Sequence, residues 1–269
     1  MDVLIEHTTV YDYETPSKYV IQSLRKTPRN FEGQFVRTWW IEAEPFTKIV
    51  KEEDGFGNRV HTLSLTGPID GLTVKVSGHV DTFDTAGIIR GTYEPFPPDL
   101  YLSETPLTAP TPAIQDFARD IQGKHPDEKL PRLHALMEAV RDRMAFDTGV
   151  TDTFTAAGDA FDAGHGVCQD FAQIFIAAAR SIGIPARYVG GYFLRADGET
   201  DQEAGHAWAE AFVPDLGWIG FDPVHCFCVT EQHVRVAVAL DYRGAAPVRG
   251  IQKGGTGERM AVSVTVKEA

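Results

Sequence analysis

Polar and apolar side chains alternate along most of the chain from Met1 to about Gly91. A period of two residues is typical of half-buried β-strands. Two strands show it most clearly, with one side formed by Val3, Ile5, His7, Thr9 and Tyr11 in the first and by Leu72, Val74, Val76, Gly78 and Val80 in the second. Segments 35–42 and 59–65 repeat the pattern, and turn-forming residues occupy 54–58. The pattern predicts an antiparallel β-domain, sandwich-like or barrel-like.

A proline-rich segment, Pro95-Phe96-Pro97-Pro98, marks the end of this alternation. After it, apolar residues recur every three or four positions, which is the spacing of amphipathic helices. Two helices are predicted from Ile114, Phe117, Ala118 and Ile121 and from Leu130, Leu133, Met137, Val140 and Met144. The change of period predicts two domains, residues 1–94 and residues 95–269.

An alanine-rich segment from Cys168 to Arg180 is apolar nearly all round and predicts a buried helix. Gly183 and Pro185 are its stop signals. Three strands are predicted after it, at 186–194, 206–212 and 218–222. A last alternating segment at 260–266 is predicted to follow them as a fourth strand.

Composition fits an ordinary globular protein: 269 residues, of which 43% are apolar and 23% charged. The net charge of −13 has the wrong sign for nucleic acid or an anionic membrane surface. Three cysteines are too few for a disulfide scaffold. The amino terminus has no signal-peptide pattern, and no apolar run approaches the ~20 residues of a membrane span. We therefore expect a cytoplasmic protein with reduced thiols.

Cys168 follows the sequence Gly164-His165-Gly166-Val167 and begins the predicted buried helix. Free backbone N–H groups and the positive end of the helix dipole favour a thiolate at such a position. The backbone N–H of Cys168 can also point at a developing oxyanion. Taken alone, a small buried side chain is the better interpretation, because free cysteine is among the most buried residue types. A nucleophile needs a base and an orienting group as well.

His206 begins one predicted strand and Asp222 ends the next, with turn residues between them. If Phe212 pairs with Trp218 in this hairpin, Asp222 is a diagonal neighbour of His206 on the same face. A register shifted by one residue would place the two side chains on opposite faces. Cysteine at a helix start, histidine on a strand and aspartate on the adjoining strand form the ordered set of a nucleophile, a base and an orienting carboxylate.

These residues lie in segments that resemble the bacterial transglutaminase-like cysteine peptidase family. The segments are Gly166-Val167-Cys168-Gln169-Asp170-Phe171-Ala172, 183–192, His206-Ala207-Trp208 and 217–223. The similarity extends over the whole chain, with 24–29 and 54–58 in the amino-terminal half and 233–237, 241–242 and 247–250 in the tail. The resemblance implies an α+β, papain-like core in which the helix bearing the cysteine packs on an antiparallel sheet. It also implies that residues 1–94 are the family's amino-terminal β-domain and residues 95–269 its transglutaminase-like catalytic domain.

Carried over residue by residue, the resemblance implies that Cys168 is the nucleophile, His206 the base and Asp222 the orienting carboxylate. It implies no metal and no other cofactor. The expected activity is cysteine-dependent amide hydrolysis, by a peptidase or isopeptidase that acts on a peptide or protein through a thioester. Trp208 and Trp218 are predicted to wall the substrate site and keep it dry, although core packing explains them equally well.

Two departures from the family pattern and three alternatives stay open. Asp162 stands where papain-type enzymes carry the glutamine that completes the oxyanion hole, and Gly205 stands where serine is expected before the histidine.

A protein-glutamine acyltransferase differs from a hydrolase only in the acceptor, and a non-catalytic binding scaffold is a third possibility. Cys226 and Cys228 form a C-x-C pair, but a structural zinc site needs further ligands at a defined spacing.

Overall fold

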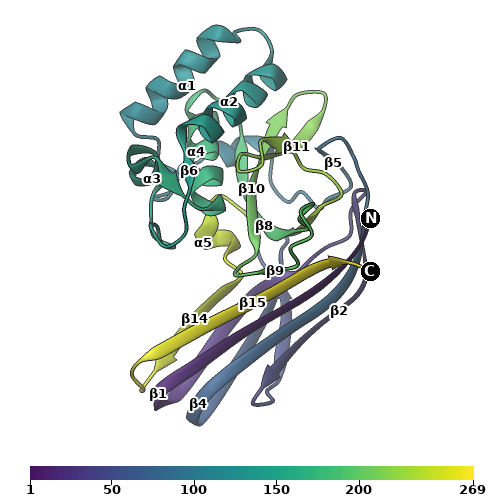
Figure 1. Ribbon diagram of the computed structural model, residues 1–269, viewed down its shortest axis with the longest axis vertical. Helices are drawn as coiled ribbons and strands as arrows, with labels where there is room; N and C mark the ends of the chain where they lie inside the picture. The colour runs from purple at the N-terminus through teal and green to yellow at the C-terminus, as the bar shows by residue number, and fades with distance from the viewer.

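The computed structural model describes residues 1–269 as two antiparallel sheets and a group of helices (Figure 1). The larger sheet, of seven strands, contains β1 (Asp2–Thr27), β2 (Gln34–Glu44), β3 (Ile49–Glu53), β4 (Arg59–Thr82), β9 (Asp201–Gln202), β14 (Val248–Lys253) and β15 (Glu258–Glu268). The smaller sheet, of six strands, contains β5 (Ile88–Ile89), β8 (Ala186–Phe193), β10 (His206–Val213), β11 (Gly217–Asp222), β12 (Phe227–Cys228) and β13 (His233–Ala239).

Four helices lie beside the smaller sheet, at the end of the molecule away from the long strands (Figure 1): α1 (Pro112–Lys124), α2 (Lys129–Arg143), α3 (Ala157–Ala163) and α4 (Cys168–Ser181). The chain also forms the 3-10 helix η1 (Pro98–Leu102) and the short helix α5 (Tyr242–Ala245), which lies nearer the long strands (Figure 1). A short parallel pair, β6 (Ala145–Phe146) and β7 (His165–Gly166), links this group to the start of α4. No helix of the chain combines the length and the apolar character that crossing a bilayer requires.

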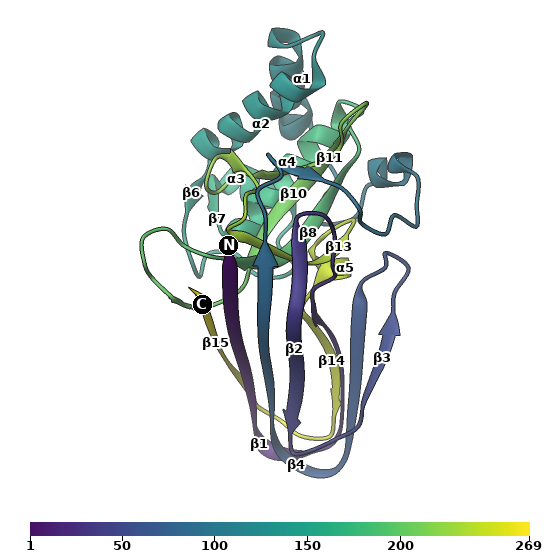
Figure 2. The same ribbon diagram turned by 90° about the vertical axis from the view of Figure 1, so that its right-hand side faces the viewer.

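Two very long strands, β1 and β4, pair along most of their length and form the centre of the larger sheet. Their register shifts near residues 12–17, where the sheet bends back on itself (Figure 2). One apolar cluster contains Tyr11 and Leu24 from the two halves of β1, and Leu63 and Leu72 from the two halves of β4. The predicted sandwich-like unit is thus one continuous sheet folded over its own core. The inward positions of both predicted strands are buried as expected.

The carboxyl-terminal strand joins the amino-terminal sheet. Segment 260–266, predicted as the last strand, lies in β15, which pairs with β1 in the larger sheet. β14 also pairs with β1, so the tail of the chain returns to the amino-terminal sheet although the range 95–269 assigned it to the catalytic domain. Alternation reports which face of a strand is buried and carries no information on which sheet buries it. The two termini consequently lie close together, with the Ala269 N–H bonded to the Asp2 carbonyl at 3.0 Å.

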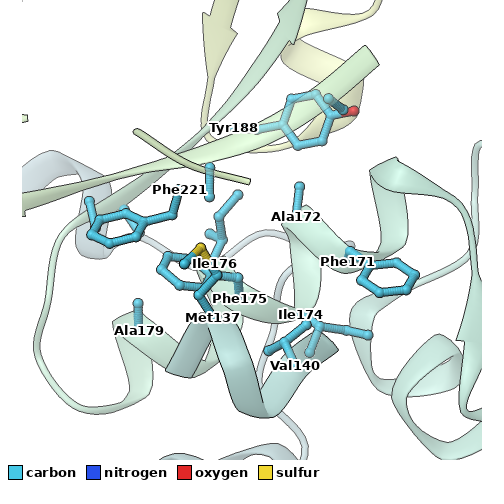
Figure 3. Packing of buried hydrophobic residues seen from close by; sticks show 14 of the residues in the cluster. Met137, Val140, Phe171, Ala172, Ile174, Phe175, Ile176, Ala179, Tyr188 and Phe221 are labelled. Carbon is cyan, nitrogen blue, oxygen red and sulfur yellow. The ribbon is translucent and has the colours of Figure 1, made fainter. Parts of the chain in front are cut away.

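Helix α4 is buried within the carboxyl-terminal half, as its nearly uniform apolar sequence predicted. Every residue from Gln169 to Arg180 is buried. The helix packs against α1, α2 and α3 on one side and against β10 on the other. The ring of Phe175 stacks on Phe221 of β11 with centroids 5.3 Å apart (Figure 3). This packing fixes the first residue of α4 relative to the sheet.

The face of the smaller sheet opposite α4 holds a buried ionic cluster. Glu210 has no exposed surface and accepts hydrogen bonds from Arg187 Nε and Arg235 Nε, each at 2.7 Å. The Arg187 guanidinium also lies 3.9 Å from the ring centroid of Trp218. The two arginines hold the pKa of Glu210 at about 2, against burial, which alone would raise it. A shared carboxylate therefore ties β8, β10 and β13 together.

Candidate active site

Helix α4 begins at Cys168, the residue that the sequence predicted for its start. Val167 is the extended N-cap residue, and the Asp170 carboxylate accepts its backbone N–H at 2.8 Å. A Cβ on Gly166 would come within 2.5 Å of that carboxylate, so only glycine lets the chain enter the helix this closely. The first N–H groups of a helix lack partners within it, and Cys168 therefore carries its thiol beside unpaired backbone donors.

The register of the β10–β11 hairpin is the one that brings the histidine and the aspartate together. Phe212 pairs with Trp218, which places Asp222 diagonally from His206 on the same face. His206 Nε2 lies 2.7 Å from Asp222 Oδ2. The other ring nitrogen, Nδ1, is left for Cys168, which lines the same cavity as His206. The structure thus joins His206 and Asp222 by a hydrogen bond and places Cys168 beside this pair.

Asp222 is fully buried and accepts more hydrogen bonds than the sequence analysis foresaw. Besides His206, Oδ2 accepts from His225 Nδ1 at 2.7 Å and from His233 Nε2 at 3.2 Å. Oδ1 accepts the backbone N–H groups of Val224 at 3.0 Å and His225 at 3.2 Å. His225 lies three residues after Asp222, within the reach of a turn, and was visible in the sequence as a neighbour. His233 comes from a strand that the pattern analysis did not predict.

The tautomer of His233 follows from its second contact. Its Nδ1 faces the Thr230 backbone N–H at 3.2 Å and must accept that bond. A neutral ring then carries its proton on Nε2, which donates to Asp222. Burial lowers the pKa of His233, which keeps this ring neutral. The buried Asp222 carboxylate therefore accepts one hydrogen bond from neutral His233 and another from His206.

Charges in the site favour a protonated His206. Burial alone would lower its pKa, but the Asp222 carboxylate and the Cys168 thiol together raise it to about 10. Burial alone would raise the pKa of Asp222, but the charge of His206 and the three imidazole hydrogen bonds hold it well below its usual range. An imidazolium between a carboxylate and a thiol is the arrangement that stabilises a thiolate nucleophile.

A cavity of about 220 Å³ opens beside the thiol. Its walls include Cys168, His206, Gln169 and the tyrosines Tyr188 and Tyr242. Burial and the neighbouring Cys168 raise the pKa of both phenols, so both stay protonated and can donate hydrogen bonds. The remaining walls include residues of β1, so the amino-terminal sheet completes the cavity.

Trp208 and Trp218 do not line this cavity, which corrects the expectation that they wall it. Both are buried in a separate cluster with Ile89, Tyr101, Val189 and Val229. Alternation explains the difference: Ala207, Ala209 and Ala211 of β10 face α4, whereas Trp208 lies on the other face of the sheet. Trp208 still packs edge-on against His233, with ring centroids 5.1 Å apart. Trp208 therefore packs against one of the histidines bonded to Asp222 and does not contact the cavity.

The two departures from the family pattern have separate structural outcomes. Asp162 is exposed on α3 and does not line the cavity. Gln169 lines it, but its Nε2 donates to the Asp152 carbonyl at 3.2 Å. A Cβ at Gly205 would lie 2.8 Å from the Gly191 carbonyl oxygen, so the strand spacing found here favours glycine over the expected serine.

One group of three potential metal-ligand atoms exists, formed by His206, Asp222 and His225 within 4.8 Å of one another. It coincides with the hydrogen-bonded site just described. Cys226 and Cys228 are free thiols outside this group. Cys228 Sγ lies 4.0 Å from His134 Nε2. Burial raises the pKa of the Cys228 thiol to about 11.

Comparison with known proteins agrees with the arrangement. A model of the transglutaminase-like superfamily matches residues 115–223, and one of the bacterial transglutaminase-like N-terminal region matches residues 3–81. An uncharacterised protein of Mycobacterium leprae is 31% identical over 262 residues, which cover 93% of this chain and 92% of that protein. A protein-glutamine gamma-glutamyltransferase of Pseudomonas aeruginosa is 35% identical over 98 residues, 33% of this chain and 15% of that one.

Among solved structures, a candidate cysteine protease from Cytophaga hutchinsonii has a similar fold. The TM-score is 0.75, and the match covers 99% of this chain and 98% of that one at 18% identity. The fold is therefore transglutaminase-like, with the amino-terminal β-rich region included.

Proposed function

The chain belongs to the transglutaminase-like superfamily, and from this premise we propose that it is a cysteine-dependent amide hydrolase, a peptidase or isopeptidase. The observation that supports the proposal most is the placement of three groups from separate elements at one cavity. Cys168 begins α4, and the His206–Asp222 pair, with Nε2 and Oδ2 2.7 Å apart, joins it from β10 and β11. A nucleophile, a proton carrier and an orienting carboxylate are the groups that acyl transfer requires.

In the acylation half, the Cys168 thiolate attacks the carbonyl carbon of the amide and forms the C–S bond. The tetrahedral oxyanion accepts the Cys168 backbone N–H at the positive end of α4. The His206 imidazolium then gives its Nδ1 proton to the leaving nitrogen, the C–N bond breaks and the amine departs. A thioester on Cys168 and a neutral His206 remain.

In the deacylation half, neutral His206 Nδ1 accepts a proton from water, whose oxygen attacks the thioester carbonyl. The second tetrahedral intermediate collapses, the C–S bond breaks, and the acid leaves with the thiolate restored beside the imidazolium. Asp222 keeps Nε2 bonded throughout, so Nδ1 always faces the reacting atoms. Three tyrosine hydroxyls belong to the cavity walls, and that of Tyr192 contacts His7. The phenols of Tyr188 and Tyr242 are therefore the candidates for a second hydrogen bond to the oxyanion.

An amine in place of water would make the same thioester an acyl donor for crosslinking. The gamma-glutamyltransferase relative favours this second candidate, although the match covers a small part of that protein. The first half of the reaction is common to both, and only the acceptor differs.

Incubation with casein and a fluorescent primary amine separates the two activities. A hydrolase yields fragments without amine incorporation, and a transferase yields labelled casein. Cys168→Ala is expected to abolish either product, whereas Cys226→Ser, a matched change of a second free cysteine, is expected to leave it unchanged. Equal activity of the wild type and Cys168→Ala would refute the proposal.

A further inference from the structure

Lys26 of β1 is a buried amine that contacts no carboxylate. It is 1% exposed. Its Nζ lies 2.9 Å from His7 Nε2 and 2.9 Å from Thr9 Oγ1, and both partners are uncharged. His7 also contacts the Tyr192 hydroxyl through Nδ1 at 3.0 Å. A protonated Lys26 has only N–H donors, so its contact with Nε2 requires the ring to accept there. Burial lowers the pKa of Lys26 to about 7 and that of His7 to about 3. A buried ammonium is costly unless an anion pairs with it.

This lysine lines the same cavity as the nucleophile. The 220 Å³ cavity has Cys168 and His206 among its walls, and β1 contributes His7, Arg25 and Lys26. No aspartate or glutamate lines it. That absence is informative because the chain as a whole has 38 acidic and 25 basic residues. Arg25 is already paired with Asp54 at 2.8 Å, so the Lys26 ammonium is the β1 charge that an anion in this cavity would pair with.

The cavity continues into a larger space of about 530 Å³ along β1, β14 and β15. The two spaces share His7, Lys26, Ala204, Gly205, Tyr242 and Pro247. The larger space adds Arg243 and Arg249 to its walls against one acid, Glu258. Lys26 therefore stands where a substrate in the larger space would reach the thiol.

We infer that the amino-terminal sheet selects the substrate, and that Lys26 binds a carboxylate of an acidic peptide-like amide whose scissile carbonyl lies at Cys168. This inference rests on the proposed function and names its substrate class. The carboxylate would supply the missing counter-charge and accept a charge-assisted hydrogen bond from Nζ. Lys26 would act on specificity, while Cys168 and His206 would carry out the reaction on acidic and neutral substrates alike.

Affinity alkylation tests the inference without a known substrate. The probes are N-bromoacetyl derivatives of glycine, β-alanine and γ-aminobutyric acid, each compared with its own primary amide, and the readout is the alkylation rate of Cys168. We expect one chain length at which the acid reacts at least about tenfold faster than its amide, as one charge-assisted hydrogen bond would produce. Lys26→Met should bring that ratio close to one. Lys75→Met, which removes an exposed lysine of β4, should leave it unchanged.

Two results would overturn the inference: an acid-to-amide ratio of one or less at every length in the wild type, or a raised ratio that persists in Lys26→Met. Neither of these results tests the proposed function. That function is tested by whether the neutral amide probes alkylate Cys168 at a rate that depends on His206. A test on the wild type covers the case in which Lys26→Met does not fold. N-acetylglutamate should protect Cys168 from iodoacetamide at concentrations where N-acetylglutamine does not, and equal protection would reject the carboxylate site.

Discussion

Asp222→Asn tests how much of the reactivity of Cys168 depends on the carboxylate behind His206. The change keeps the shape of the side chain and removes its charge. The pKa of His206 stands at about 10 instead of 6.5, which corresponds to about 5 kcal/mol in favour of the imidazolium. Asp222 contributes both a charge and a hydrogen bond to this preference. If it supplies half, the variant loses about 2–3 kcal/mol, or about 30- to 160-fold in the imidazolium–thiolate pair.

The assay is the rate of iodoacetamide alkylation of Cys168 from about pH 6 to about pH 8, followed by peptide mapping. A stable ion pair predicts a nearly constant rate in the wild type, because His206 keeps its proton across this range. In Asp222→Asn the rate near pH 6 should fall by about 30- to 160-fold and should climb with pH. Asp215→Asn is the matched control, since Asp215 is exposed in the turn of the same hairpin.

A wild-type rate and pH profile in folded Asp222→Asn would refute the electrostatic reasoning. Circular dichroism and a urea titration of each variant establish that it is folded. A loss of rate in Asp215→Asn as large as that in Asp222→Asn would refute it as well, because the effect would then be unrelated to the contact with His206.

The remaining predictions concern the packing that holds the site. Glu210→Gln removes the charge shared by its two buried arginines, and urea unfolding should show a loss of about 3–5 kcal/mol, whereas a change under about 1 kcal/mol would contradict the shared-carboxylate account. His233→Phe should cost about 1–3 kcal/mol of unfolding free energy, and His225→Ala, a third exposed, clearly less; the reverse order would count against a buried donor at Asp222. Phe175→Ala should cost about 3–5 kcal/mol in the same titration, because the ring is fully buried against Phe221.

Local pattern was sufficient to predict the elements that carry the site. A helix that is apolar on every side has to be buried, and glycine and proline mark where it ends, so α4 was predictable to its first residue, Cys168. The hairpin of β10 and β11 was predictable from its turn residues. Its register was not, because a slip of one residue leaves the turn plausible and reverses every face. The pairing of Phe212 with Trp218 had to come from the structure.

The pattern of polar and apolar residues could not predict contacts between residues that are distant in the sequence. His233 contacts Asp222 from β13, whose alternation is weak because most of the strand is buried on both sides. In the sequence Lys26 is an ordinary polar residue of a predicted β-region. The structure shows that it is buried, because the larger sheet bends over this part of β1. The placement of Trp208 away from the cavity depends likewise on which face of the smaller sheet α4 covers. These features depend on how the two sheets meet.

Acid-quench mass spectrometry tests the central claim most directly. The protein is mixed with a chromogenic acyl ester, quenched within one turnover and digested, so that the acyl group can be assigned to a residue. The account predicts a thioester on Cys168, and it predicts that His206→Ala forms little of it. Cys226 and Cys228 serve as internal controls in the same digest, because burial raises the pKa of both thiols. Acylation spread equally over the three cysteines, or acylation of Cys168 that is unchanged in His206→Ala, would contradict the account.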